Sequence, residues 1–209
     1  MTSITPITRL TFTIAALLCG AVLSACATRA PTPVLYDFGP LRAAETDSVP
    51  PARLPPIRVA EVRAPMWLDS RAMYFRLAYA DEQQTRPYAS SRWTMPPAML
   101  FGQRLKARLA QAGSVVLAAS DRAVDAPLLL RIEAEEFMQT FASPTASSVR
   151  VAVRASVFNG HTLLAQKPFM RQESAPTPDA SGGAHALAIA SDGIITDMIA
   201  WLAQLPAQP

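Results

Sequence analysis

The amino-acid sequence predicts an α+β fold, a single two-layer domain in which two amphipathic helices cover one face of a mostly antiparallel sheet. Two neighbouring segments, 128–134 and 149–157, alternate apolar and charged residues, which is typical of strands with one solvated face. Two other segments, 94–113 and 184–205, repeat apolar residues at three- to four-residue spacing, which is typical of helices. Helices and strands in this order favour helices gathered on one face of a sheet.

The two central strands are expected to carry charges on their solvated face. Apolar side chains share one face of each strand, whereas Glu133, Glu135, Arg150 and Arg154 lie on the other. If the strands pair, these glutamates face these arginines across the sheet. Such exposed ion pairs contribute little to stability, so we interpret them as a solvated sheet face.

The remaining strands are shorter. They are predicted at residues 34–38, 57–62, 73–79, 115–118 and 162–171. The dipeptide Asn159-Gly160, which favours a hairpin turn, precedes the last of them.

Proline and glycine mark the ends of the two helices. Thr94, Pro96 and Pro97 indicate the start of the first helix, because proline is tolerated in a first helical turn. Gly113 is placed to end it. Small residues and prolines at 174–183 predict a loop, and the second helix is expected from Ala184 to Leu205.

The N-terminal segment ends in Leu23-Ser24-Ala25-Cys26, which resembles the lipobox of bacterial lipoproteins. A retained membrane anchor is the first alternative, because residues 10–28 carry no charge. Ordinary secretion is the second, but small residues gather before Cys26 as cleavage requires, and plain secretion needs no cysteine there. Cleavage would leave Cys26 as the new N-terminus, carrying a diacylglyceryl group and acyl chains that hold it on a membrane.

This interpretation divides the chain into four parts: a signal peptide at 1–25, the lipidated cysteine and its tether at 26–33, one domain at 34–205 and a tail at 206–209. Ala27 follows the cysteine where an aspartate would favour retention at the inner membrane. We therefore expect a lipid-anchored protein on the periplasmic face of the outer membrane. Cys19 would leave with the signal peptide, so the mature domain would hold no disulfide.

Charge excludes one class of partner. The chain has 19 basic and 16 acidic residues, and losing Arg9 with the signal peptide lowers the net charge from +3 to +2. A nucleic-acid-binding protein needs a basic patch or run, and the basic residues here are dispersed.

An ordered set of motifs follows the lipobox along the chain. The motifs are Tyr36-Asp37-Phe38, Ile57 to Val62, Pro65-Met66-Trp67-Leu68-Asp69-Ser70-Arg71, Met73-Tyr74-Phe75-Arg76, Arg92-Trp93, Leu128 to Phe137 and Trp201-Leu202. This set resembles the ABC-type transport auxiliary lipoprotein family, which includes the lipoprotein partners of Pqi-type and other MCE (mammalian cell entry) systems. The resemblance spans roughly residues 34–205. In the family's central motif a tyrosine is usual where Trp67 stands, and Ser70 separates an aspartate and an arginine that are usually adjacent.

The resemblance implies a docking subunit of an MCE/ABC-type system that moves lipids or solvents between membranes. Its partners would be an MCE-domain protein with the ABC permease and ATPase, besides the membrane itself. A periplasmic lipid-binding carrier and an outer-membrane assembly lipoprotein stay open as alternatives. Aromatic residues and arginine are enriched in interfaces, so the candidate partner-binding residues are Trp67, Tyr74, Arg76, Tyr79 and Trp93. Packing of the same aromatics in the core is the competing interpretation.

The sequence offers no catalytic or metal-binding set, and we expect a protein that is not an enzyme. His161 follows the predicted hairpin turn, and His185 falls in the first turn of the last helix. No His, Cys or acidic residues have metal-ligand spacing, and no phosphate-binding loop occurs. The expected non-protein groups are therefore only the acyl groups on Cys26.

Overall fold

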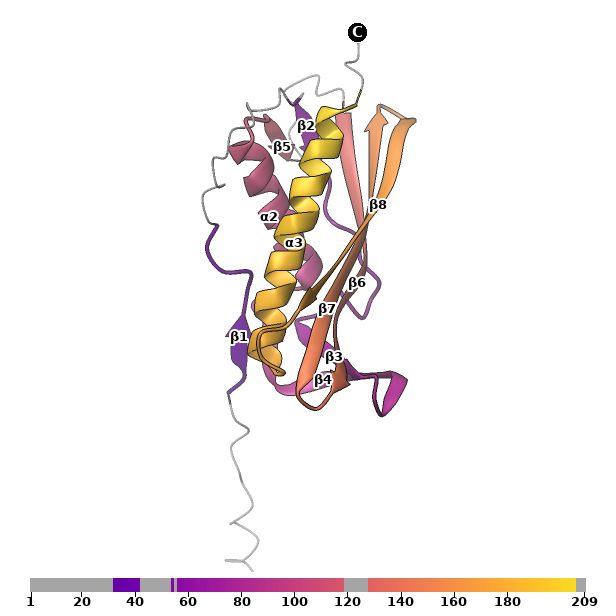
Figure 1. Ribbon diagram of the computed structural model, residues 1–209. Helices are drawn as coiled ribbons and strands as arrows, with labels where there is room; N and C mark the ends of the chain where they lie inside the picture. Colours follow the sequence, from indigo (N-terminus) through magenta and orange to yellow (C-terminus); the bar gives the residue numbers. More distant parts are fainter. Residues whose placement is uncertain (1–31, 42–53, 55, 119–127, 206–209) are drawn as a thin grey trace, which may run out of the picture. The chain divides into compact units, whose positions relative to one another are not determined.

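The computed structural model describes residues 32–41, 54, 56–118 and 128–205. The predicted signal peptide, the tether up to residue 31 and the tail lie outside the described residues and stay predictions. The described part forms eight strands and two helices (Figure 1). In chain order these are β1 (Val34–Tyr36), β2 (Ile57–Val59), β3 (Ala72–Leu77), β4 (Asp81–Trp93), α2 (Pro97–Gln111), β5 (Val116–Ala118), β6 (Leu128–Ser143), β7 (Ala146–Asn159), β8 (Thr162–Ser174) and α3 (Ala180–Ala203).

The three longest strands form an antiparallel ladder, in which β7 lies between β6 and β8. The predicted alternation is confirmed on both central strands: on β7, Val149, Val151, Val153 and Val157 are fully buried, whereas Arg150 and Arg154 on the opposite face are exposed. The β7–β8 turn contains Gly160 at a φ of +55°, where glycine avoids the steric cost of a Cβ. These strands supply most of the buried sheet surface.

The sheet as a whole is mixed: the antiparallel pairing that the sequence predicts holds for β3–β4, β6–β7 and β7–β8, and the other pairings are parallel. Among the described strands, four of the seven pairings are parallel, namely β1–β4, β2–β5, β2–β6 and β3–β6. Both β2 and β3 lie along the edge of β6 that faces away from β7. Alternation shows which side chains of a strand are buried, but it carries no information about which strand pairs with it or in which direction. The three-residue strands β1, β2 and β5 find partners far along the chain.

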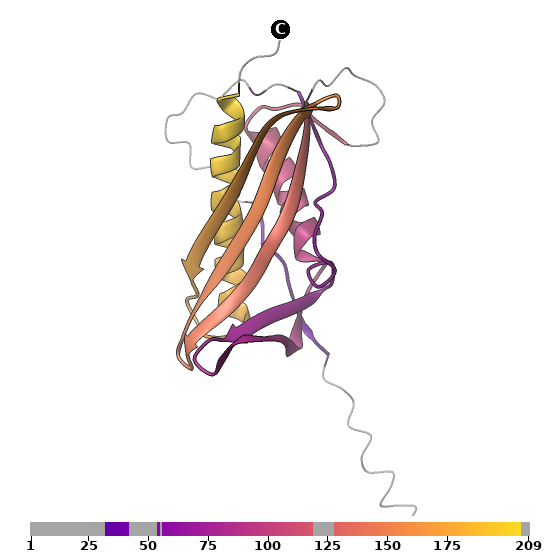
Figure 2. The same cartoon turned by 90° about the vertical axis from the view of Figure 1, so that its right-hand side faces the viewer.

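Both helices lie on the same side of the long, curled strands (Figures 1 and 2). α3 packs against β7 and β8, and α2 contacts α3. Ile194, Ile195 and Met198 form the buried face of α3. Among the described helices, α3 is long and apolar enough to cross a membrane, yet this buried face is that of a core helix.

Two elements differ from the prediction. No alternation of apolar and polar residues predicts β4, because the first half of this strand is polar and exposed on both faces. α3 begins at Ala180 rather than Ala184, because Asp179 caps it and the small residues after Asp179 are helical rather than part of the loop. The end of α2 at Gly113, with a φ of +83°, is confirmed, although Pro96 rather than Thr94 precedes its first turn.

Candidate docking surface

A tight turn between β2 and β3 carries the most exposed large apolar side chain among the described residues. The backbone N–H groups of Leu68 and Asp69 both donate to the carbonyl of Pro65, at 2.8 and 3.1 Å. Leu68 is 2% exposed and anchors the turn in the core. Met66, two residues earlier, is 91% exposed. The turn therefore presents a flexible, polarizable side chain directly to solvent.

Trp67 in the same turn is held by an aromatic contact. Its ring meets that of Tyr74 on β3 edge to face, with centroids 5.8 Å apart at 77°. Trp67 is 36% exposed and Tyr74 is half-buried. Edge-to-face pairs restrict both rings, so the exposed part of Trp67 is presented in one orientation beside Met66. We call Met66, Trp67 and Tyr74 the aromatic turn.

A shallow depression of about 310 Å³ adjoins the aromatic turn. It is lined by Arg63, Ala64, Pro65, Glu133, Ala134, Glu135 and Arg154. Its wall is held by the backbone of Arg63, which donates to Ile132 at 2.9 Å and accepts from Ala134 at 2.8 Å. Because Pro65 both lines the depression and starts the turn, the two features form one continuous surface.

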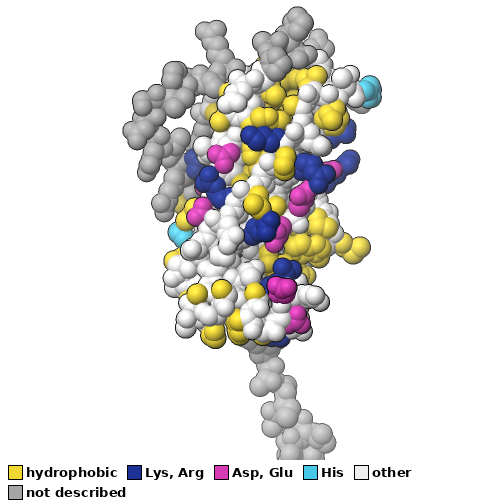
Figure 3. Space-filling model, turned by 45° about the vertical axis from the view of Figure 1, so that its right-hand side comes forward, with side chains coloured by type: hydrophobic (Ala, Val, Ile, Leu, Met, Phe, Trp, Pro, Cys, Tyr) yellow, Lys and Arg dark blue, Asp and Glu magenta, His cyan; other side chains and the backbone are white. Residues whose placement is uncertain are grey.

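The charges around the depression are mixed. Arg154 pairs with Glu133 at 3.6 Å and with Glu135, as the sequence analysis predicts. Arg150 instead pairs with Glu136 at 3.2 Å. The register between β6 and β7 shifts by one residue between Ala134 and Glu136, which brings Glu136 onto the charged face. Figure 3 shows acidic and basic side chains interspersed on this side of the molecule, with hydrophobic side chains gathered along its right-hand margin.

Arg63 differs from the other arginines of this surface. Within the described part of the chain no carboxylate lies within ion-pair distance of its guanidinium, and the residue is exposed. An arginine without an intramolecular partner is available for a carboxylate or carbonyl of another protein.

Residues 36–199 match the model of a family described as "ABC-type transport auxiliary lipoprotein component". The chain belongs to this family. The resemblance identified from the ordered sequence motifs is thus confirmed. No curated protein matches the chain.

Solved structures show the same fold as this auxiliary lipoprotein. The protein XCC0632 from Xanthomonas campestris, of the family DUF330, is similar with a TM-score of 0.69 and 16% identity, over 80% of this chain and 93% of that one. An uncharacterized protein is similar with a TM-score of 0.64 and 14% identity, over 82% of this chain and 99% of that one. At such identities the likeness concerns the fold alone.

The other candidate residues of the auxiliary lipoprotein do not join the aromatic turn equally. Arg76 follows Tyr74 on β3, and its Nη2 donates weakly to Thr85 at 3.5 Å. Tyr79 is 49% exposed in the turn between β3 and β4. Trp93 is 2% exposed and packs edge to face on Phe38, with centroids 5.9 Å apart. The indole of Trp93 is therefore not accessible to a partner in this structure.

The backbone of Trp93 instead links β4 to the start of β3. The guanidinium Nε of Arg71 donates to the carbonyl of Trp93 at 2.9 Å, and Trp93 N–H donates to the carbonyl of Arg71 at 2.8 Å. Two of the motif residues behind the family resemblance thus hold the ends of β3 and β4 together. Met66 and Arg63 are not among the partner-binding residues that the sequence predicts, because neither residue type nor spacing distinguishes an exposed turn from a buried one.

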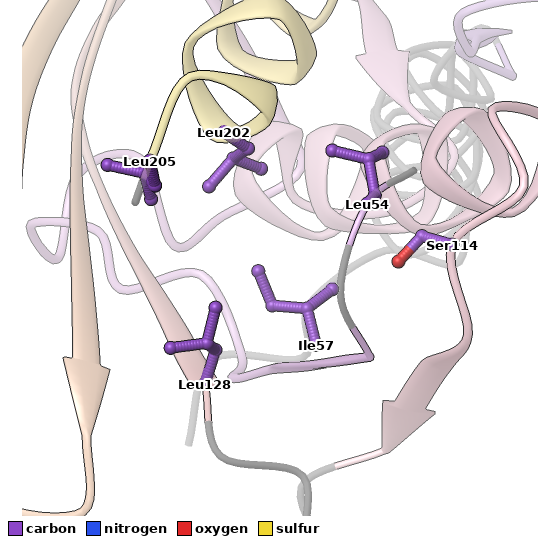
Figure 4. A pocket seen from close by; sticks show the side chains of 6 residues that line it. All are labelled: Leu54, Ile57, Ser114, Leu128, Leu202 and Leu205. Atoms are coloured by element: carbon purple, nitrogen blue, oxygen red, sulfur yellow. The ribbon is translucent and has the colours of Figure 1, made fainter. Parts of the chain in front are cut away.

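A small, partly open pocket lies at the C-terminal end of α3 (Figure 4). Leu54, Ile57, Ser114, Leu128, Leu202 and Leu205 line it, and its volume is about 10 Å³. That is room for about one water molecule and not for an acyl chain. Within the described ranges, no group of three or more His, Cys, Asp or Glu side chains could hold a metal ion.

Proposed function

We propose that this protein is a docking subunit of an MCE/ABC-type system that moves lipids or solvents between membranes, anchored through Cys26 to the periplasmic face of the outer membrane. Its family consists of transport auxiliary lipoproteins and is not a known enzyme family. The family description supports a partnership with an ABC transport system. An MCE-domain protein is the partner that we propose within that system.

The observation that carries the proposal is the exposure of Met66 beside Trp67. Adjacent exposed apolar side chains rimmed by polar residues are typical of protein-binding sites, and Met66 and Trp67 are two such neighbours in one turn. Aromatic residues, methionine and arginine are enriched in such interfaces. The depression beside the aromatic turn adds the free guanidinium of Arg63 and the mixed charges around Arg154.

The anchor has a simple physical consequence for docking. Two or more acyl chains hold a protein on a membrane almost permanently. A subunit confined to that surface meets a membrane-spanning partner at a high effective concentration. Its binding site can therefore have a modest affinity for the partner.

Cross-linking in cells tests the proposal. With the unaltered chain we expect an MCE-domain protein and components of its ABC transporter among the cross-linked products. A Cys26→Ala variant should leave the membrane fraction after a high-salt wash and keep its circular dichroism spectrum, because Cys26 lies outside the folded domain.

Either of two results would contradict the proposal. Recovery of no MCE-type protein with the unaltered chain would remove the partner, and continued sedimentation of the Cys26→Ala variant with outer membranes would remove the lipid anchor. An outer-membrane assembly defect on depletion, with no effect on lipid transport, would favour the assembly role instead.

A further inference from the structure

The first strand exposes two adjacent aliphatic side chains. Val34 is 53% exposed and Leu35 is 51% exposed. Neighbouring residues of a strand point to opposite faces, so the described part of the chain leaves both faces of β1 about half exposed at this point. β1 pairs with β4 along one edge, and no other described strand joins it.

The segment after β1 is fastened to the body of the domain. Phe38 is buried and stacks on Phe137, with ring centroids 6.3 Å apart. The buried guanidinium of Arg104 on α2 donates to the carbonyl of Phe38 and, at 3.1 Å, to that of Gly39. These contacts attach the segment after β1 to the core, so the position at which the chain enters the domain is fixed.

That point lies at one end of the long strands. Figures 1 and 2 share a vertical axis, and in both the start of β1 lies at the same end as the β3–β4 and β6–β7 turns. The β7–β8 turn and the C-terminal end of α3 lie at the opposite end. Tyr79, 49% exposed in the β3–β4 turn, is thus a third exposed side chain with apolar surface at the end that carries Val34 and Leu35.

The short length of chain between Cys26 and β1 indicates that this end of the domain faces the membrane. Val34 is eight positions after Cys26, and a fully extended chain of that length spans about 25 Å. β6 has 16 residues, which corresponds to about 50 Å at roughly 3.3 Å per residue. A lipid on Cys26 therefore keeps the β1 end within half a strand length of the bilayer.

We infer that the β1 end of the domain rests on the bilayer surface and that Val34, Leu35 and Tyr79 contact the lipid headgroup region. Aliphatic side chains gain from leaving water, and tyrosine suits an interface that is apolar on one side and wet on the other. The exposed acids Asp81 and Glu82 lie at the same turn and would be repelled by anionic lipid. We therefore attribute the contact to the apolar side chains and not to charge. The inference rests on the lipidation of Cys26 and not on the identity of the partner.

This orientation places the aromatic turn above the membrane. Arg63, in the depression beside the turn, lies next to Glu133, ten residues before the end of β6, which corresponds to about 30 Å along the strand. Tyr74 precedes Phe75, which pairs with Gln139 four residues before that end, so the aromatic turn itself lies about 15 Å or more along the strand. Met66 and Trp67 would then meet a partner that extends into the periplasm rather than one lying flat in the bilayer.

Fluorescence quenching tests the inference. The lipidated full chain is reconstituted in vesicles of phosphatidylethanolamine and phosphatidylglycerol with nitroxide-labelled headgroups. It carries a fluorophore on a single engineered cysteine, Leu35→Cys or Leu163→Cys. These leucines are 51% and 49% exposed at opposite ends of the domain, so they are a matched pair. Tyr79→Cys provides a second position at the β1 end, and circular dichroism confirms that each variant is folded.

We expect loss of fluorescence at positions 35 and 79 and none at position 163. Equal loss at both ends, or greater loss at position 163, would overturn the inference. Labelling of the unaltered chain would reveal a free Cys26 thiol and would remove the anchor on which the inference depends. Because no partner is present in the vesicles, failure to recover an MCE-type protein from cells leaves this result unaffected.

Discussion

The phenol of Tyr88 donates a hydrogen bond of 2.9 Å to the side-chain carbonyl of Gln139, 51 residues along the chain. The amide of Gln139 donates in turn to Ser147 Oγ at 2.9 Å and to the carbonyl of Asp179 at 3.1 Å. Gln139 is 1% exposed, and burial raises the pKa of Tyr88 further than the nearby charge of Asp179 does. One buried amide thus joins β4, β6, β7 and the start of α3.

Replacing Gln139 by leucine should destabilise the domain by about 2–3 kcal/mol, because buried partners of the amide would lose their hydrogen bonds. Urea unfolding measures the change. Gln166→Leu is the matched control: Gln166 also donates a hydrogen bond of 2.9 Å, to Ser156, but it is exposed. We expect the control to change stability by no more than about 0.5 kcal/mol. Equal losses in the two variants would contradict a structural role for the network.

Acid should weaken the start of α3 through Asp179. Its carboxylate accepts from the backbone N–H of Gly182 and from Thr177 Oγ1, both at 2.8 Å, and these hydrogen bonds lower the pKa of Asp179 below its ordinary value. A lowered pKa stabilises the fold above the ordinary value, about 4, and this contribution is lost as the pH falls through the lowered pKa.

The expected result is a melting temperature that falls on acidification in the unaltered protein and falls less in Asp179→Asn, which keeps a capping side chain but does not titrate. Thermal unfolding between about pH 5 and pH 2 measures both slopes. The same slope in both proteins would show that Asp179 does not contribute to acid sensitivity.

Two glycines of α3 should respond differently to alanine. A Cβ on Gly182 would collide with the backbone carbonyl of Thr177, whereas the atoms nearest to a Cβ on Gly193 are those of the Arg171 guanidinium. Gly182→Ala should therefore cost about 2 kcal/mol or more, because the backbone must move. Gly193→Ala should be neutral or stabilising by up to about 1 kcal/mol, because alanine favours helices and an arginine tip can shift. Denaturant unfolding of the two variants measures the difference, and the reverse order would contradict this description of α3.

The docking surface is tested by placing a charge on the aromatic turn. Met66→Glu should reduce partner recovery by about tenfold, since central interface residues often contribute more than 1 kcal/mol. Met99→Glu is the matched control, because Met99 is a 53% exposed methionine on another element, α2. Both variants should unfold at the temperature of the unaltered protein. Loss of the partner in both variants, or in neither, would exclude this surface.

Periodicity succeeded where one face of a strand is buried and the other is in water. The valines and arginines of β7 could be assigned to faces from the sequence because their alternation continues for most of the strand. The same periodicity does not predict β4, because the exposed half of this strand has no buried apolar face and therefore shows no alternation. Arg150 was paired with the wrong glutamate side chains, because a register shift in β6 leaves no mark on the sequence.

The candidate site was only partly predictable for a related reason. Trp67 and Tyr74 were chosen by residue type and do lie together. Trp93 was chosen by the same criterion and lies in the core, because burial depends on which segments pack over a residue. Met66 has no periodic partner, so only the hydrogen bonds of its turn reveal that it points outward.

The sequence by itself determined the family, the helices and most strands, because these depend on residue order and local spacing. It also carries the predicted lipobox at Cys26. Only the tertiary structure decided that the sheet is mixed, that Trp93 is buried while Met66 is exposed, and that Val34 and Leu35 lie at one end of the long strands. These properties arise from contacts between residues far apart in the chain, whose pairing no local pattern records.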